Sequence, residues 1–171
     1  YSLNLNKKIK INIFDIRDKK KLTLYVYKIK PQFIFHLAAQ PLILEGYKEP
    51  YKTYEINTLG TLNILEISRK SKFVRSLICV TSDKCYESNS STTGFKETDR
   101  LGGVDPYSGS KAAAEIIIKT YIESFQKKQK ILGIASARAG NVMGGGDKSQ
   151  NRLIPDIVNS LYKKNKIFIR N

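Results

Sequence analysis

The chain has 171 residues, of which 41% are hydrophobic and 26% charged, and its formal net charge is +15. This composition is typical of a globular protein with a real core, and no apolar run approaches the ~18 residues that a membrane span needs. The lysines are scattered and form no stripe interleaved with aromatic residues, so the charge does not predict a nucleic-acid partner.

Strand and helix patterns alternate along the chain. Short apolar runs predict strands at residues 11–14, 33–37, 76–80 and 132–137, with a further strand beginning at 167. Helices are predicted at 19–28, 50–71 and 153–162, and a fourth begins at Asp105-Pro106, because an acidic cap followed by proline is typical of a helix start. Asp18 is predicted to cap the first helix. The fourth helix is expected to turn Ala112, Ala113, Ile116, Ile117 and Tyr121 inward.

This alternation predicts an α/β protein with a doubly wound, mostly parallel sheet, the Rossmann-like arrangement. In such sheets ligands bind at the carboxyl ends of the strands. Here those ends read "FDIRD", "HLAAQ", "VTSDK" and "SARAGN", and all four become small or polar where a ligand would lie. The candidate site is therefore expected at this edge of the sheet.

Tyr107 and Lys111 in "DPYSGSK" lie one helical turn apart. An ammonium beside a phenol favours the phenolate, so Tyr107 is a candidate general base for oxidation of an alcohol. The spacing alone is weak, because Tyr162 and Lys166 form a second such pair. Context separates the two pairs: only Tyr107 follows a capped helix start and a strand that ends in hydroxyl residues.

Cys79 and Cys85 lack metal-ligand spacing, and His36 is the only histidine. We therefore expect no metal site, a core position for Cys79 and a hydrogen-bonded structural role for His36. A disulfide is not expected, which favours a reducing, cytoplasmic location.

Five segments carry a family resemblance: "HLAAQP", "VTSDKCYE", "LGGVDPYSGSKAAAE", "ARAGNVMGGGD" and "RLIPDIV". In order and spacing they resemble the extended short-chain dehydrogenase/reductases, and most closely the CDP-glucose 4,6-dehydratases. The resemblance implies NAD as cofactor, CDP-glucose as substrate, a 4-keto-6-deoxy product for deoxysugar and cell-surface polysaccharide synthesis, and a homo-oligomer without nucleic-acid or membrane partners.

The resemblance also implies roles for individual residues. Tyr107, with Lys111 and Ser82, would take the C4 hydroxyl proton while NAD takes the hydride; Asp83 would protonate the leaving C6 hydroxyl, and Lys84 would be the base at C5. Cofactor positions fall on Asp15, Ile16, Leu37, Ala38, Ala39, Gln40 and Thr81, together with Tyr107 and Lys111. Substrate positions fall on Ser82, Asn141, Arg152 and Leu153. Asn57 and Gly60 match a helix in which the asparagine supports the sheet or the site, or is purely structural.

Four departures from the family pattern stand out. Leu44 and Gly46 replace the usual arginine and serine, and Gly109 replaces a serine in the "YSGSK" motif, at a cost in helix propensity. The glycine-rich strand-turn-helix that seats a pyrophosphate is absent from the sequence. We therefore expect an internal fragment, inactive alone, with residues 1–150 as a partial NAD-binding domain and 151–171 as the start of the substrate region.

Three interpretations stay open from the sequence. The first is a CDP-glucose 4,6-dehydratase, and the second is another nucleotide-sugar epimerase or dehydratase. The third is a non-catalytic remnant of the fold. Asp83-Lys84 favours the dehydratase over the epimerase, and the joint presence of Ser82, Asp83, Tyr107 and Lys111 argues against decay.

Overall fold

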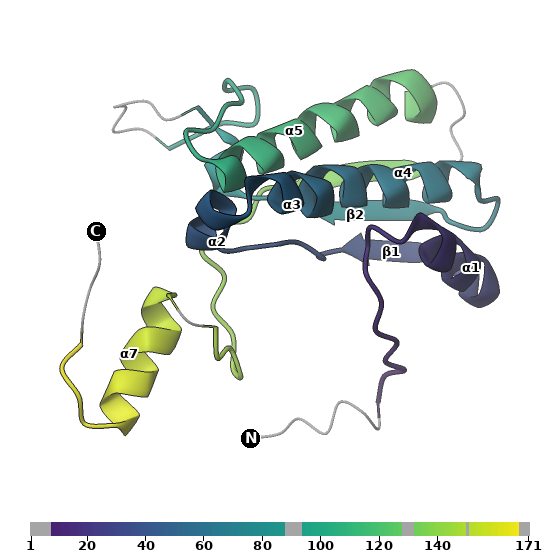
Figure 1. The fold of residues 1–171 in the computed structure, drawn as a ribbon. Helices are drawn as coiled ribbons and strands as arrows, with labels where there is room; N and C mark the ends of the chain where they lie inside the picture. Colours follow the sequence, from purple (N-terminus) through teal and green to yellow (C-terminus); the bar gives the residue numbers. More distant parts are fainter. Residues whose placement is uncertain (1–7, 88–93, 128–131, 150, 168–171) are drawn as a thin grey trace. The chain divides into compact units, whose positions relative to one another are not determined.

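A computed structural model describes residues 8–87, 94–127, 132–149 and 151–167. The chain divides into two compact units. Asn12–Gly140 forms the larger unit, and residues 8–11 with the described residues from 141 onward form the smaller. The larger unit holds the sheet, and its arrangement is shown in Figure 1.

The sheet consists of three parallel strands in the order β1-β2-β3. They are β1 (Phe33–His36), β2 (Ser76–Val80) and β3 (Gly133–Ala137). Their register aligns Phe33 with Ser76 and Ser76 with Gly133, so all three carboxyl ends meet at one edge. The predicted strands at 33–37, 76–80 and 132–137 and the parallel α/β fold class are confirmed.

The strand predicted at residues 11–14 is wrong, because these residues have no strand conformation. Among the described residues no strand lies beside this segment or beyond β1, and an isolated extended segment has no partner for its backbone hydrogen bonds. Ile13 is 94% exposed, although the Phe14 ring packs edge-on against Tyr25 at 5.3 Å. Most of the strand predicted from 167 lies outside the described residues.

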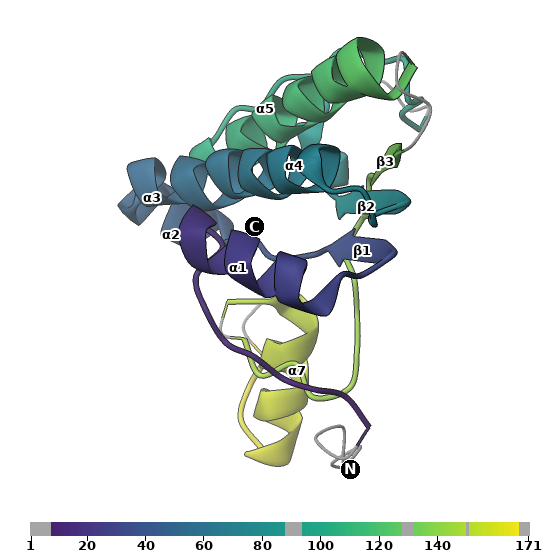
Figure 2. The same ribbon diagram turned by 90° about the vertical axis from the view of Figure 1, so that its right-hand side faces the viewer.

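Three helices form one layer over the sheet. Figure 2 shows α1 (Lys19–Ile29), α4 (Gly60–Lys70) and α5 (Pro106–Tyr121) in a row beside β1, β2 and β3. The predicted caps are confirmed: Asp18 accepts a hydrogen bond from the Lys21 amide, and Asp105 accepts one from the Ser108 amide. Capping these first-turn amides fixes where α1 and α5 begin.

The helix predicted over 50–71 is present but changes pitch along its length. It runs as α3 (Pro50–Tyr54), a π-helical turn η2 (Glu55–Leu59) and α4, and a short helix α2 (Ile43–Lys48), not predicted, precedes it. π-turns inside α-helices are frequent at functional sites. Here the turn carries Asn57, which is 1% exposed.

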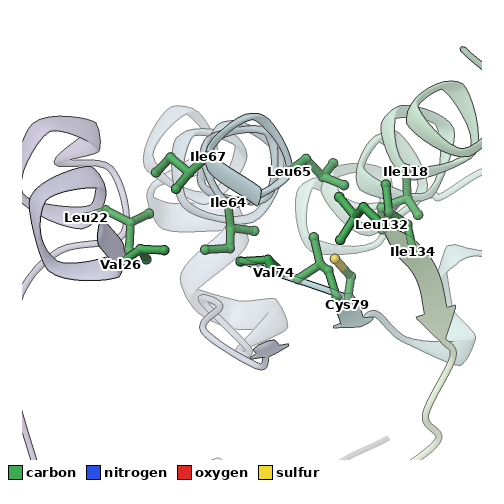
Figure 3. Packing of buried hydrophobic residues seen from close by; sticks show 11 residues of the cluster. Leu22, Val26, Ile64, Leu65, Ile67, Val74, Cys79, Ile118, Leu132 and Ile134 are labelled. Carbon is green, nitrogen blue, oxygen red and sulfur yellow. The ribbon is translucent and has the colours of Figure 1, made fainter. Parts of the chain in front are cut away.

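The core lies between the helical layer and the sheet. Leu22 and Val26 of α1, Ile64 and Leu65 of α4, and Ile118 of α5 pack in one cluster with the buried side chains of the sheet (Figure 3). Cys79 is 1% exposed and free, as predicted. Burial of these side chains contributes about 25 cal/mol per Å² of apolar surface removed from water, which orients the three helices on one face.

One part of the predicted α5 face is wrong. Ala112 is buried, but Ile116 is 56% exposed, and the side chains turned most fully inward are those of Ser110, Ala114, Glu115 and Ile118. The predicted set included residues on two sides of the helix. The unexpected member is Glu115, a carboxylate that is only 3% exposed.

The opposite face of β1 is open among the described residues. Phe33, Phe35 and Leu37 are each more than 60% exposed, whereas Ile34 and His36 of the same strand face the helices. This alternation follows from the period of two in a strand.

The smaller unit contains α7 (Leu153–Tyr162), with the bounds that the sequence predicted. Arg152 pairs with Asp147 at 3.3 Å, just before this helix. No described helix is both long and apolar enough to cross a membrane.

Candidate active site

A turn of polar residues continues directly from β2. Asp83–Cys85 forms a single 3-10 turn, and Ser82 caps it by accepting a hydrogen bond from the Lys84 amide at 3.2 Å. The Ser82 hydroxyl also donates to Asp83 Oδ1 at 3.2 Å, and Lys84 Nζ lies 3.2 Å from Asp83 Oδ2. Ser82 is buried, whereas the side chains of Asp83 and Lys84 are 40% and 45% exposed, so both can meet a ligand.

The predicted Tyr107–Lys111 pair lies on the first turns of α5, which packs against this 3-10 turn. Lys111 is 6% exposed, and its ammonium donates to the Val80 carbonyl at 3.5 Å, at the end of β2. Burial lowers the pKa of Lys111 below its ordinary value. The structure thus brings Lys111 to the strand end that leads into Ser82 and Asp83, with Tyr107 half-buried one turn before it.

The competing Tyr162–Lys166 pair has a different setting. Tyr162 is the last residue of α7 and is 86% exposed, and Lys166 is exposed as well. Neither belongs to the unit that holds the strand ends. The preference for Tyr107 therefore rests on burial and position as well as on sequence context.

The end of β1 leaves two apolar side chains exposed. Leu37 and Ala38 are exposed, Ala39 is half-buried and Gln40 is buried. Asn57 holds the backbone here, accepting from the Gln40 amide at 2.8 Å and donating to the Gln40 carbonyl at 3.0 Å.

Asn57 also donates to the Ser110 hydroxyl of α5 at 2.9 Å, and so joins the end of β1 to that helix. Of the two roles left open for Asn57, these contacts favour support of the strand end.

Asp15 and Ile16 lie in the loop before α1. Arg17 forms a 2.7 Å ion pair with Asp15 and a 3.1 Å ion pair with Glu55 of the π-turn. Hydrogen bonds from Arg17 lower the pKa of Asp15 to about 2. Ile16 packs on Gly60, where an added Cβ would lie 2.8 Å from Ile16 Cγ2, so this close approach requires glycine.

Two of the sequence departures meet the helix that carries Tyr107. A Cβ added at Gly46 of α2 would lie 3.2 Å from the Tyr107 nitrogen, so glycine lets α2 approach the first turn of α5. A Cβ added at Gly109 would lie 2.4 Å from the Tyr54 hydroxyl, which occupies that space. Leu44, in place of the usual arginine, is 50% exposed.

Beside Asp83 lies a hollow of about 480 Å³ whose walls include Tyr86, Phe95, Glu97 and Arg138. The Tyr86 and Phe95 rings stack at 4.6 Å, and the Arg138 guanidinium lies over the Tyr86 ring at 4.8 Å. These residues were not predicted from the sequence.

The partner of Thr81 was not predicted either: the Thr81 hydroxyl donates to the buried carboxylate of Glu115.

Two further predictions concern His36 and the cysteines. His36 is buried and hydrogen-bonds Thr61 Oγ1 at 3.0 Å, so its structural role is confirmed. Burial, with a smaller contribution from Lys111, lowers the pKa of His36 to about 4. Cys79 and Cys85 are free. The part of the chain that the structure describes holds no group of three metal-ligating side chains.

The predicted substrate residues Asn141, Arg152 and Leu153 belong to the smaller unit. Arg152 is held by Asp147, and Leu153 is 56% exposed at the start of α7. Their roles, like those of the predicted cofactor and catalytic residues, stay predictions.

Residues 2–170 match the family described as GDP-mannose 4,6 dehydratase. The chain is 40% identical over 173 residues to the CDP-glucose 4,6-dehydratase of Salmonella typhimurium, a match that covers 99% of this chain and 48% of that protein. It is 30% identical over 165 residues to the dTDP-D-glucose 4,6-dehydratase of Dictyostelium discoideum, covering 91% of this chain and 36% of that protein. The chain thus spans no more than about half the length of these relatives.

Solved structures share the fold. The UDP-glucose 4-epimerase of Thermotoga maritima, solved with UDP-glucose, superimposes with a TM-score of 0.86 at 22% identity, over 100% of this chain and 54% of that one. The dTDP-glucose 4,6-dehydratase of Bacillus anthracis, solved in complex with NAD, gives 0.73 at 26% identity, over 90% and 44%. The predicted resemblance is confirmed, and because the match extends from residue 2 to residue 170, the chain belongs to the GDP-mannose 4,6 dehydratase family.

Proposed function

We propose that the protein carrying this chain is an NAD-dependent CDP-glucose 4,6-dehydratase, a lyase that makes the 4-keto-6-deoxy sugar nucleotide. One observation carries the proposal: the Ser82-Asp83-Lys84 turn follows β2 with one residue between it and Val80, whose carbonyl the buried Lys111 contacts. The 40% identity to the Salmonella CDP-glucose enzyme supports CDP-glucose as the substrate.

The side chains have complementary chemistry for the proposed reaction. Tyr107 accepts the proton of the C4 hydroxyl, assisted by the ammonium of Lys111 and the hydroxyl of Ser82. A ketone at C4 makes the C5 hydrogen acidic, and Lys84 is the proposed base there. Asp83 protonates the C6 hydroxyl as it leaves. The hollow beside Asp83 supports this role, since it gives a sugar room to approach the carboxyl.

Several described residues fit a dinucleotide. Leu37 and Ala38 are exposed at the end of β1, and the neighbouring backbone is held by Asn57, so a planar ring can approach this edge closely. Asp15 and Ile16 are the proposed adenine-side residues, with Thr81, Ala39 and Gln40 lining the path between them and Tyr107. NAD, when bound, would take up the hydride from C4 and return it at C6. NAD in the solved dTDP-glucose dehydratase of Bacillus anthracis supports this cofactor.

The remaining proposals concern organisation. We propose that residues 1–150 belong to the NAD-binding domain and that 151–171 begin the substrate-binding region. Arg152 and Leu153 of that region, with Asn141 from the end of the first, are the proposed contacts to the nucleotide sugar. The free thiols of Cys79 and Cys85 support a reducing, cytoplasmic location. Assembly as a homo-oligomer stays a prediction, to be measured by light scattering.

A chimera provides the test. In it, this chain replaces the matching segment of the Salmonella CDP-glucose 4,6-dehydratase; the unmodified Salmonella enzyme is the control. Purified chimera is incubated with NAD and with CDP-, UDP- or dTDP-glucose, and the 4-keto product is read from its absorbance in base. We expect product with CDP-glucose. A folded chimera that converts none of the three, or that only epimerises UDP-glucose at C4, would contradict the proposal.

Asp83→Asn separates the proposed acid from a residue that only orients the sugar. The variant should slow water elimination while leaving exchange of the C4 hydrogen into NAD detectable with deuterated substrate. Equal loss of both steps would mean that Asp83 orients the substrate.

A further inference from the structure

A buried carboxylate joins α5 to the ends of two strands. Glu115 lies one turn after Lys111 and is 3% exposed. Its Oε1 accepts from the Thr81 hydroxyl at the end of β2, and its Oε2 accepts from the Ser136 hydroxyl of β3 at 3.0 Å. Arg138, just past β3, donates to the same Oε2 at 2.8 Å. One carboxylate thus holds three side chains from both strand ends.

Arg138 extends this connection to the loop beyond the 3-10 turn. Its second amino group donates to the Glu97 carbonyl at 3.0 Å, and its guanidinium lies over the Tyr86 ring at 4.8 Å. Tyr86 in turn stacks on Phe95. Arg138 is therefore held on three sides, and it holds the walls of the hollow beside Asp83.

The backbone carries the position of Arg138 to Asp83. Beyond the strands, the Thr81 amide donates to the Ala137 carbonyl and the Asp83 amide donates to the Ala139 carbonyl, both at 2.9 Å. These two acceptors flank Arg138 in the chain. A shift of Arg138 would therefore move the carbonyl that holds Asp83.

A buried ion pair is a poor source of stability, because desolvation offsets most of its Coulombic gain and apolar replacements are often as stable. The pair does impose geometry, because the planar guanidinium directs one amino group to Glu115 and the other to the Glu97 carbonyl. We propose that Glu115 and Arg138 are positioning residues that fix the strand-end turn carrying Asp83. This inference rests on the proposed function for the role of Asp83, but the geometry can be tested without any reaction.

Hydrogen exchange at single amides, measured by NMR on the 171-residue chain, tests the geometry. Arg138→Lys keeps the charge but loses the planar fork and the contact with Tyr86. We expect the Asp83 amide to exchange at least about tenfold faster, the effect of losing one hydrogen bond's stabilisation, while the amides of β2 keep their rates.

Arg69→Lys is the matched control. Arg69 also pairs with a glutamate, Glu66, at 2.7 Å and also lies over an aromatic ring, Phe125, at 4.7 Å. It lies near the end of α4, just before β2 begins and so at the opposite edge of the sheet. The exchange rate of the Asp83 amide should be unchanged in this variant.

Three results would overturn the proposal: an unchanged Asp83 amide in Arg138→Lys, equal acceleration of Asp83 and the β2 amides, or the same response in Arg69→Lys. If Arg138→Lys does not fold, Ser136→Ala replaces it, because this variant removes one donor to Glu115 and no charge. Its Asp83 amide should exchange about threefold faster, and no change would again overturn the proposal.

In the chimera, Arg138→Lys should lower kcat about tenfold and leave KM for CDP-glucose within about twofold, because misplacement of an acid affects the transition state. Glu115→Gln keeps only one of the two acceptor oxygens and leaves the Arg138 guanidinium without its carboxylate, so it should lower kcat at least as much. A rise in KM alone would contradict a positioning role. An unmodified chimera without activity would refute the proposed function and leave the exchange result standing.

Discussion

Gly109 and Tyr54 form a pair whose effects on stability depend on one another. Gly109 lies within α5, between Tyr107 and Lys111, where glycine is a poor helix former. A Cβ at this position would lie 2.4 Å from the Tyr54 hydroxyl and 3.5 Å from its ring carbon Cζ. Only the hydroxyl is too close, because 3.5 Å is an ordinary contact. The glycine is therefore explained by the tyrosine across the α3–α5 contact.

The two opposing contributions set the expected magnitude. Alanine favours a helix interior over glycine by about 1 kcal/mol. Inserting a methyl group into a packed core costs about 1–3 kcal/mol, and the low end applies here because the Tyr54 side chain is 41% exposed and only its hydroxyl must move. Gly109→Ala should therefore leave the free energy of unfolding nearly unchanged in the natural chain. In the Tyr54→Phe chain the same change should raise it by about 1 kcal/mol, a coupling of about 1 kcal/mol.

Urea unfolding of the four chains, followed by circular dichroism, measures this cycle. Gly133→Ala in β3 is the control, since a Cβ there meets only the Arg75 carbonyl at 3.5 Å and its effect should not depend on Tyr54. If Gly109→Ala has the same sign and size with Tyr54 and with Phe at that position, the steric explanation for the glycine fails.

Three further predictions concern the tyrosine pairs, the buried histidine and the cofactor. In the chimera, Tyr107→Phe should abolish C4 oxidation, whereas Tyr162→Phe, at an exposed position, should change kcat less than about twofold. Equal losses would mean that Tyr107 is not the general base. The pKa of His36 falls from 6.5 to about 4 on folding, so as the pH is lowered the unfolded chain takes up the proton first. The free energy of unfolding should therefore drop by up to about 3 kcal/mol as the pH falls from 6.5 to 4. Urea titrations of His36→Gln should lack this contribution, and an unchanged loss would refute the prediction. Calorimetric titration of the 171-residue chain alone should show no tight NAD binding, because its sequence has no glycine-rich unit to seat the pyrophosphate; a micromolar Kd would contradict this.

The elements predicted correctly are those whose signals are local. Asp105-Pro106 predicts the start of α5 because a cap and a proline act on neighbouring amides, and Asp18 predicts α1 for the same reason. Short apolar runs predict β1, β2 and β3 because strands buried in a parallel sheet need apolar residues. The run at 11–14 has the same composition but is not a strand, since a strand also needs a neighbour, and composition says nothing about neighbours.

In the candidate site, too, local motifs are readable from the sequence and contacts between distant segments are not. Ser82, Asp83, Tyr107 and Lys111 could be selected as candidates because each occupies a recognisable motif, and their catalytic roles stay predictions. Glu115 and Arg138 stand in the same motifs but are not predictable as partners, because their contact joins segments 23 residues apart.

A signal for Glu115 was nonetheless present: a lone acid in the apolar stretch "AAAEIII" interrupts a helix that should be buried. Burying a carboxylate without a partner would cost several kcal/mol, so an acid at such a position predicts a cation or hydroxyl donors opposite it. The strand that packs there ends in "SARAGN", whose only cation is Arg138. A buried acid in one motif thus requires a partner in another motif that packs against it. Here the requirement of Glu115 points to Arg138, at the strand end whose backbone holds the turn that carries Asp83.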